Sequence, residues 1–190
     1  MIFDSNNQLH RAAIHEAGHV ICYHVLGRID SVEYAEIYTD EEIGNGFCDR
    51  EEECLNPNDI SFNTPQGYKY WIEEFYIRVA GVCAEKSIFR ESDIDKRLLN
   101  DEIKPLIERE EKLLIACGIC CQHDSGKKIV NELVEKALFD ISRLFEEDAN
   151  LRLIREVAHC LLIAKEVLIN GILTKRISQK IIHEVIRKNQ

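Results

Sequence analysis

The sequence has no apolar run that approaches the roughly 18–20 residues needed to cross a bilayer. Its first residues, MIFDSNNQLHR, also lack the basic start and the apolar stretch of a secretory signal peptide. Neither internal repeats nor low-complexity linkers interrupt the 190 residues. These absences predict a cytoplasmic protein without a membrane segment, and the length fits a single domain with a buried core.

Positive charge is scarce in this sequence. Lysine and arginine total 24 against 34 aspartate and glutamate residues, which gives a formal net charge of −10. Because binding to duplex nucleic acid depends on clustered Lys and Arg, we expect no nucleic-acid partner. The densest acidic stretch, DEEIGNGFCDREEEC over residues 40–54, is interpreted as a solvated loop.

The eight cysteines lack the regular spacing that a disulfide framework produces. We therefore expect most of them to be reduced and to behave as small apolar residues. The segment CGICCQH has one CxxC step, and without a second pair this step is a weak metal signal. We interpret it as cysteines at a helix end. A second zinc site or a redox-sensitive thiol pair is the alternative for Cys117, Cys120, Cys121 and His123.

Helical periodicity dominates the first half of the chain. It predicts a helix over residues 9–26 that ends at Gly27. A second helix is expected to begin at the Thr64–Pro65 step and to run to about residue 89, since proline is favoured at the first helical position. Between these helices SVEYAEIY (31–38) is rich in strand formers, and glycines separate it from FCD, which predicts a short hairpin.

A third helix is predicted to begin at Ser92, with Asp95 as its reciprocal capping partner. Pro105 is expected to kink or break this helix, because proline removes a backbone donor. Apolar residues at helical spacing predict two further helices, over about 130–144 and over 151–168.

Asn170 and Gly171 are expected to end the helix over 151–168, and a last helix is expected to include Ile177. The predicted fold class is therefore all-α, or mainly α, with a small β-hairpin. We divide the single domain into a metal-site half over 1–123 and C-terminal helices over 124–190.

The motif HEAGH lies within the first predicted helix. Residues four apart on a helix are about 40° apart around its axis, so His15 and His19 can present two imidazole nitrogens to one ion. Glu16 lies about 100° from His15, which is too far for a third ligand beside both histidines. Its place suits a general base that takes the proton of a zinc-activated water. The alternative is that two histidines and a glutamate meet by accident on this helix.

Gly18 is an unusual residue for a helix interior, where glycine costs on the order of 1 kcal/mol relative to alanine. Together with Ala12, Ala13 and Ala17 it predicts another element packed closely over this helix. His24 lies about 140° from His19 around the axis and is interpreted as an ordinary residue outside the metal face.

Catalytic zinc sites use three protein ligands, so two histidines leave one position to fill. The extension HExxHxxGxxH is absent, because positions 22–25 read CYHV. The candidate carboxylates are Glu85 in AGVCAEKSIF, and Asp93 or Asp95 in ESDIDKRLL. Glu85 is more readily explained as packing, or as a partner that holds the other nitrogen of a histidine.

The segment HRAAIHEAGHVICYHVLG resembles the peptidase helix of the FtsH-type ATP-dependent zinc proteases, whose motif is also HEAGH after small residues. AGVCAE is similar to the Ala-Gly-x-x-Ala-Glu segment that precedes the third zinc ligand of that family. CLLIAKEVLINGILTKRISQKIIHEVI is similar to the C-terminal helices of the family. The resemblance implies a helical bundle of the FtsH peptidase-domain type and a zinc-dependent metalloendopeptidase.

The third zinc ligand of that family is an aspartate in an Asn-Asp-Leu-type motif at a helix start, and SDID carries this role to Asp93. The resemblance thus implies Zn²⁺ held by His15, His19 and Asp93, with Glu16 as the catalytic base. Asp93 also has a purely structural interpretation, because acidic residues are favoured in the first turn of a helix. Asp95 stays open as the alternative ligand.

Two features depart from the family. The residues FRE stand where the family has Thr-Gly-Ala, and its ATPase module and membrane segment have no counterpart in these 190 residues. The expected substrate is a peptide or an unfolded protein, with a homo-oligomer or a separate ATPase as the partner that the resemblance suggests. The alternative function is a catalytically silent module of this fold that binds a partner or regulates it.

Overall fold

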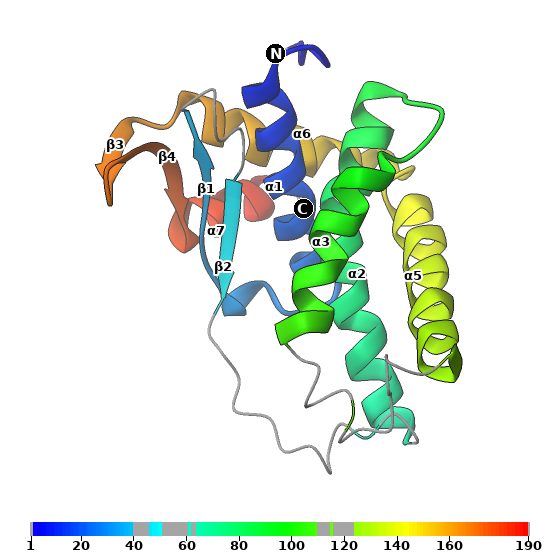
Figure 1. Cartoon of the computed structure of the whole chain (residues 1–190). Helices are drawn as coiled ribbons and strands as arrows, with labels where there is room; N and C mark the ends of the chain where they lie inside the picture. The colour runs from blue at the N-terminus through cyan, green and yellow to red at the C-terminus, as the bar shows by residue number, and fades with distance from the viewer. Residues whose placement is uncertain are drawn as a thin grey trace.

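A computed structural model describes residues 2–39, 46–50, 61, 64–109, 115 and 124–189, and the backbone alone of 46–50. The chain is mainly helical, with one small antiparallel sheet on one side of the helices (Figure 1). The predicted fold class is confirmed, although the sheet has four strands and is larger than the single hairpin expected. Within the described residues no helix combines the length and the apolarity needed to span a bilayer.

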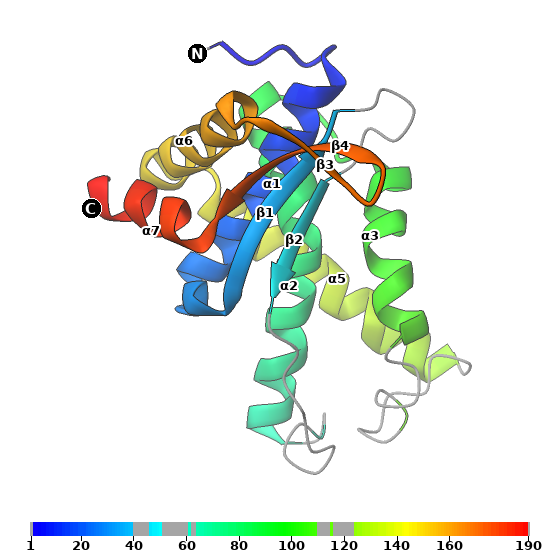
Figure 2. The same ribbon diagram turned by 90° about the vertical axis from the view of Figure 1, so that its left-hand side faces the viewer.

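Helix α1 (Gln8–Val25) lies at the centre of the molecule, between the sheet, α2 and α6 (Figures 1 and 2). It begins where the side chain of Asn7 accepts a hydrogen bond from the backbone N–H of His10 at 3.1 Å. It ends before Gly27, which has the left-handed φ of 71° that glycine adopts without a Cβ penalty. The run Ala12–Tyr23 is buried throughout, because neighbours cover this helix on every side.

Helix α2 (Pro65–Phe89) packs against α1 on one face and against α5 on another. Thr64 caps it as predicted, since its hydroxyl accepts from the backbone N–H of Gly67 at 3.0 Å. The helix ends at Arg90, whose φ of 58° turns the chain into the left-handed region. The turn leads directly to α3, which lies beside α2.

Helix α3 (Lys96–Arg109) begins four residues later than expected. Ser92 is not its cap: Asp95 is, because Asp95 Oδ1 accepts from the backbone N–H groups of Arg97 at 2.8 Å and Leu98 at 3.2 Å. The helix also continues through Pro105, so the proline does not break it. Burial of Ile103 and Leu106 on the inner face offsets the hydrogen bond that the proline removes.

Three more helices follow in the part of the chain that the structure describes after residue 123. Helix α5 (Asp124–Leu144) packs on α2, and α6 (Asp148–Ile163) packs on α1. The short α7 (Gln179–Lys188) contacts α6 and the sheet. The predicted helix over about 130–144 is thus found, with an earlier start.

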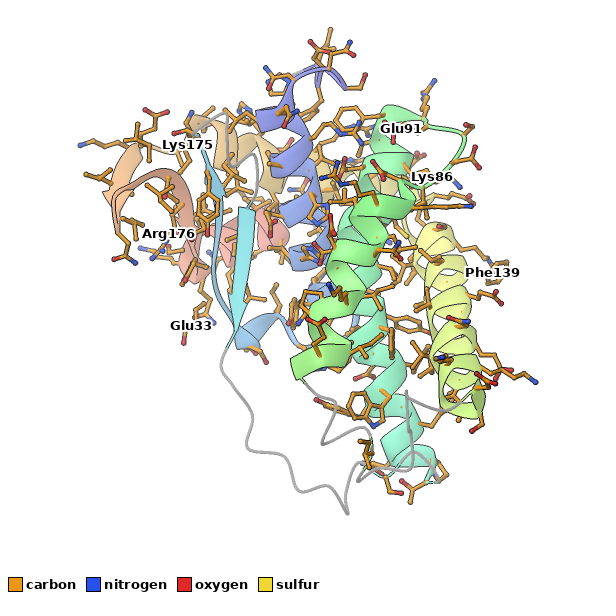
Figure 3. The ribbon with its side chains drawn as sticks, in the orientation of Figure 1. Glu33, Lys86, Glu91, Phe139, Lys175 and Arg176 are labelled. Atoms are coloured by element: carbon orange, nitrogen blue, oxygen red, sulfur yellow. The ribbon has the colours of Figure 1, made fainter. Side chains whose placement is uncertain are left out.

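The sheet has the strand order β2-β1-β4-β3 and is antiparallel throughout. Its strands are β1 (Val32–Tyr38), β2 (Gly46–Arg50), β3 (Glu166–Ile169) and β4 (Ile172–Ser178). The hairpin of β1 and β2 is the predicted one. Arg176 in β4 (Figure 3) donates from Nε to the buried Glu36 carboxylate of β1 at 2.7 Å. The sheet therefore joins the two halves into which the sequence was divided.

Strands β3 and β4 correct the prediction of one helix over 151–168 and a last helix that includes Ile177. Helix α6 ends at Ile163, and Asn170 and Gly171 form the turn of a hairpin rather than the end of a helix. Both have positive φ, 51° and 83°, as a two-residue turn between antiparallel strands requires. Ile177 belongs to β4, where it is buried, and only the residues from Gln179 onward are helical. This segment pairs with the edge of β1 that β2 leaves free. Helical spacing alone could not reveal that pairing.

Candidate metal centre

The predicted close packing over HEAGH is real, and its partner is α2. A Cβ on Gly18 would lie 2.6 Å from the Cβ of Ala84 and 2.7 Å from the carbonyl oxygen of Ala80. No side chain fits in that space, so glycine is required where the two helices cross. The close approach brings the backbone of α2 beside the two histidines of α1.

Gly81 gives the ring of His15 its space. A Cβ on Gly81 would lie 2.3 Å from Nε2 of His15, well inside any permitted contact. Glu85 follows one helical turn later on the same face of α2. The segment AGVCAE therefore supplies α1 with small residues for contact, an open place for an imidazole and a carboxylate beside it.

His15 contacts two carboxylates. Its Nδ1 lies 2.8 Å from Oε1 of Glu85, and its Nε2 lies 3.2 Å from Oε1 of Glu102 in α3. Burial alone would lower the pKa of His15, but the hydrogen bonds to Glu102 and Glu85 outweigh it and raise the pKa to about 10. Without a metal ion His15 is therefore an imidazolium that donates one proton to each carboxylate.

His19 is uncharged, in contrast to His15. Its Nδ1 donates to the backbone carbonyl of Ile77 at 2.7 Å, which leaves the lone pair on Nε2. Nε2 lies 3.9 Å from Oε2 of Glu102. Burial, together with the charge of His15, lowers the pKa of His19 to about 4. His19 is thus a neutral imidazole whose free nitrogen faces the same carboxylate as His15.

Glu102 completes the cluster. Burial alone would raise its pKa, but the hydrogen bond from His15 and the charges nearby lower it to about 2. One ligand atom from each of His15, His19 and Glu102 can be chosen such that all three lie within 4.8 Å of one another. The cluster therefore joins two nitrogens and one oxygen from two helices that lie far apart in the sequence.

The donor set and the spacing fit zinc. Two ligand atoms at the usual 2.0–2.1 Å from a tetrahedral zinc ion lie about 3.3 Å apart. Oε1 of Glu102 lies 3.2 Å from Nε2 of His15, close to that value, whereas Oε2 lies 3.9 Å from Nε2 of His19, so an ion would draw the His19 side of the cluster closer. Both Nδ1 atoms have acceptors, as zinc-bound histidines almost always do, so both Nε2 atoms can serve as ligands. Two histidines and one glutamate also form a known catalytic zinc set.

Glu16 lies next to His15 in sequence and is almost fully buried. Burial raises its pKa to about 8, and the positive charge of His15 opposes that rise. A carboxyl group with a pKa near neutrality can accept and return a proton at physiological pH. Its electrostatic setting is thus the one that a general base needs.

Asp93 does not join the cluster. It is exposed, and its Oδ2 accepts a hydrogen bond from Oγ of Ser92 at 3.0 Å. Asp95 caps α3 and is also exposed. Glu85 has the supporting place that the sequence suggested, on Nδ1 of His15. The carboxylate that the structure brings to the two histidines is Glu102, two turns beyond the cap of α3.

Sequence reasoning missed Glu102 because the search for a third ligand stopped at the start of α3. A signal was present in the spacing of apolar residues. Glu102 lies four residues after Leu98 and four before Leu106, so an acidic residue interrupts the inner face of an amphipathic helix. Since a half-buried carboxylate on the inner face of a helix needs a partner, this interruption favours a functional site.

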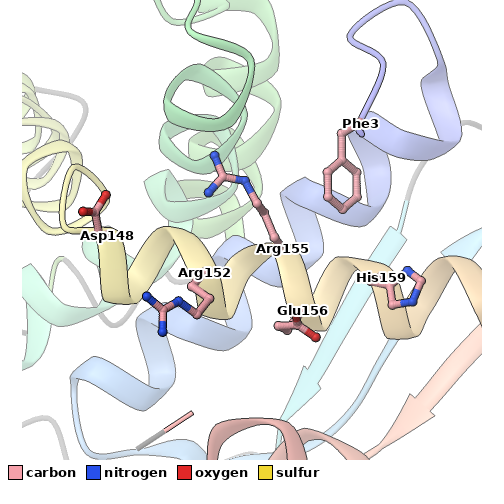
Figure 4. A pocket seen from close by; sticks show the side chains of 6 residues that line it. All are labelled: Phe3, Asp148, Arg152, Arg155, Glu156 and His159. Carbon is pink, nitrogen blue, oxygen red and sulfur yellow. The ribbon is translucent and has the colours of Figure 1, made fainter. Parts of the chain in front are cut away.

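Two other candidate sites have less support from the structure. The CGICCQH segment lies outside the residues that the structure describes, whereas Cys22 and Cys83 are buried free thiols. A separate hollow of about 530 Å³ lies beside α6 (Figure 4). None of its lining residues belongs to the metal cluster; they are Phe3, Asp148, Arg152, Arg155, Glu156 and His159.

The sequence matches no protein-family model and no curated protein. The resemblance to FtsH-type proteases therefore stays a prediction that depends on sequence segments such as HEAGH and AGVCAE.

Proposed function

We propose that this protein is a zinc-dependent metallopeptidase whose metal ligands are His15, His19 and Glu102. The observation that carries the proposal is the arrangement of the two imidazoles. Each has an acceptor at Nδ1, and each turns Nε2 toward the carboxylate of Glu102. In the proposal Glu102 replaces the sequence-based choice of Asp93 as third ligand.

Glu16 is the general base in this mechanism. Bound zinc would supply Lewis-acid polarisation of a peptide carbonyl and a lower pKa for the attacking water. Glu16 takes the proton of that water and passes it to the leaving amine. With a pKa of about 8 Glu16 is mostly protonated at pH 7 without metal, and a bound cation would favour the charged form that takes a proton.

The substrate in this proposal is an extended peptide that pairs with β2. Strand β1 has no edge for a peptide, because β2 and β4 pair with its two edges. Strand β2 is at the end of the described sheet, and in both views it lies between β1 and α3 (Figures 1 and 2). Among the described residues no strand pairs with the other edge of β2, and a peptide added there would lie along a strand that contacts the HEAGH helix. Delivery of unfolded substrates by a separate ATPase, or assembly into a homo-oligomer, follows from the resemblance.

The test combines metal content with cleavage. Purified protein should carry one zinc ion per chain and cleave an unfolded protein such as casein. Glu16→Gln should keep the zinc and lose cleavage, because glutamine matches the size of glutamate but cannot take a proton. The double variant His15→Ala, His19→Ala should lose both. Equal zinc in the wild type and in the double variant would refute the site.

One observation favours the alternative of a catalytically silent module. Without metal, the imidazolium of His15 is paired with both Glu85 and Glu102, so the buried charges compensate one another. A module that only binds a partner could keep this network as a structural ion pair. Stoichiometric zinc without cleavage of casein, or full thermal stability without any zinc, would favour this alternative.

A further inference from the structure

Arg11 lies one helical turn before His15 on α1, on the same side of the helix. Its Nη2 is 2.5 Å from Oε2 of Glu85, whose other oxygen accepts from Nδ1 of His15. A single buried carboxylate from α2 therefore links two residues of α1. The chain of contacts runs from the guanidinium through Glu85 to the imidazole.

The guanidinium of Arg11 makes two further contacts. Its Nη1 lies 2.6 Å from Oε1 of Glu91, which is labelled in Figure 3 just beyond the end of α2. Its guanidinium also lies over the ring of Phe89, 5.3 Å from the ring centroid. A planar guanidinium can satisfy all of these contacts at once, whereas the ammonium of a lysine is a single point charge. The arginine thus has one fixed orientation.

We infer that Arg11 is a positioning residue for the metal centre, which acts by fixing the carboxylate of Glu85 that orients His15. This inference depends on the metal centre proposed above. Outer partners of metal-bound histidines set the ring orientation and the tautomer, and their loss typically costs 10–100-fold in metal affinity. Arg11 contacts such a partner rather than the histidine. Without Arg11, the Glu85 carboxylate loses its anchor on Oε2, and the ring of His15 loses a fixed acceptor.

Zinc affinity of single and paired variants tests this inference. We expect Arg11→Gln to weaken zinc binding about 10-fold, the low end of the range for outer partners. Arg11→Lys should restore part of that loss, because its charge can still reach Glu85. Arg11→Gln added to Glu85→Gln should cost nothing further, since both changes act through one contact. Glu91→Gln should have a smaller effect than Arg11→Gln.

A spectroscopic measurement separates positioning from general stability. Cobalt(II) in place of zinc should show a changed visible absorption spectrum in Arg11→Gln, because the geometry around the ion changes. Arg152→Gln, which alters an exposed arginine of α6, is the matched control and should leave affinity and spectrum unchanged. Thermal unfolding of each variant without metal shows whether the fold is intact.

The outcomes distinguish this inference from the proposed function. Wild-type protein that binds no zinc overturns both. Zinc bound through His15 and His19, with unchanged affinity and spectrum in Arg11→Gln, overturns the positioning role alone. Additive losses in the Arg11 and Glu85 pair would also overturn it, because they would show that Arg11 acts by a separate route.

Discussion

Oε1 of Glu102 lies 3.2 Å from Nε2 of His15, although 87 residues separate the two along the chain. This contact joins α3 to α1 through a half-buried carboxylate and a buried imidazole. Glu102 also contacts His19, so its carboxylate faces two imidazoles. The assignment of the third ligand, and with it the proposed chemistry, depends on this relationship.

The ligand assignment predicts opposite behaviour for two acidic residues of the same region. Glu102→Gln should weaken zinc binding by more than about 100-fold, since the loss of a ligand exceeds the cost of losing an outer partner. Asp93→Asn should leave zinc affinity unchanged, because its carboxylate contacts Ser92 and lies outside the cluster. Titration of both variants with a competing zinc chelator measures the difference. A large loss in Asp93→Asn with none in Glu102→Gln would return the ligand role to Asp93.

Substitutions of the two glycines at the contact of α1 and α2 are predicted to lower different properties, zinc affinity for Gly81 and the free energy of unfolding for Gly18. Gly81→Ala places a methyl group 2.3 Å from Nε2 of His15, so the ring must move and zinc affinity should fall. Gly18→Ala meets the Ala80 backbone at 2.7 Å, so the helices must separate. We expect it to lower the free energy of unfolding by about 1–3 kcal/mol, as overpacking does. Zinc titration and chemical denaturation of both variants check this; an unchanged zinc affinity in Gly81→Ala would contradict it.

Zinc binding should release protons, and its affinity should depend on pH. The pKa of His15 is about 10 without metal, so the ring is protonated at pH 7 and must lose a proton from Nε2 to bind zinc. Affinity should therefore rise about tenfold per pH unit as the pH approaches 10 from below. Glu16, with a pKa of about 8, adds a partial release because a nearby cation favours its charged form. Calorimetry in buffers of different ionisation enthalpy counts the protons.

A variant of Glu16 tests whether this residue contributes to the release of protons on zinc binding. Glu16→Gln should reduce the number of protons released at pH 7 and leave the contribution of His15. Zinc binding without any release of protons would show that His15 is already neutral before the metal arrives.

The hairpin of β3 and β4 should depend on its turn residues. Gly171 has a φ of 83°, so Gly171→Ala should cost about 1–2 kcal/mol in the free energy of unfolding. Gly171→Asn should cost less, because asparagine tolerates the left-handed region better than alanine. Chemical denaturation of the two variants measures the difference. Equal stability of all three proteins would argue against the turn, and for a helix through this segment.

Local features of α1, the helix that contains HEAGH, and of the start of α2 could be predicted from the sequence. The four-residue spacing fixes His15 and His19 on one side of any helix that contains them. The presence of Gly18 among small residues predicted a close neighbour, which is α2. The Thr64–Pro65 step marked the start of α2, because capping depends on residues adjacent in the chain. Such features are decided within one or two helical turns.

Tertiary structure alone decided the rest. Helical spacing predicted helix up to residue 168 and again at Ile177, but this part of the chain pairs with β1 and forms β3 and β4 instead. Glu102 meets the histidines only because α3 packs beside α2, at a distance along the chain that no local pattern encodes. Periodicity identifies the side of a helix that will be buried. It does not identify the residue on another helix that will face it, since that depends on how the folded chain packs.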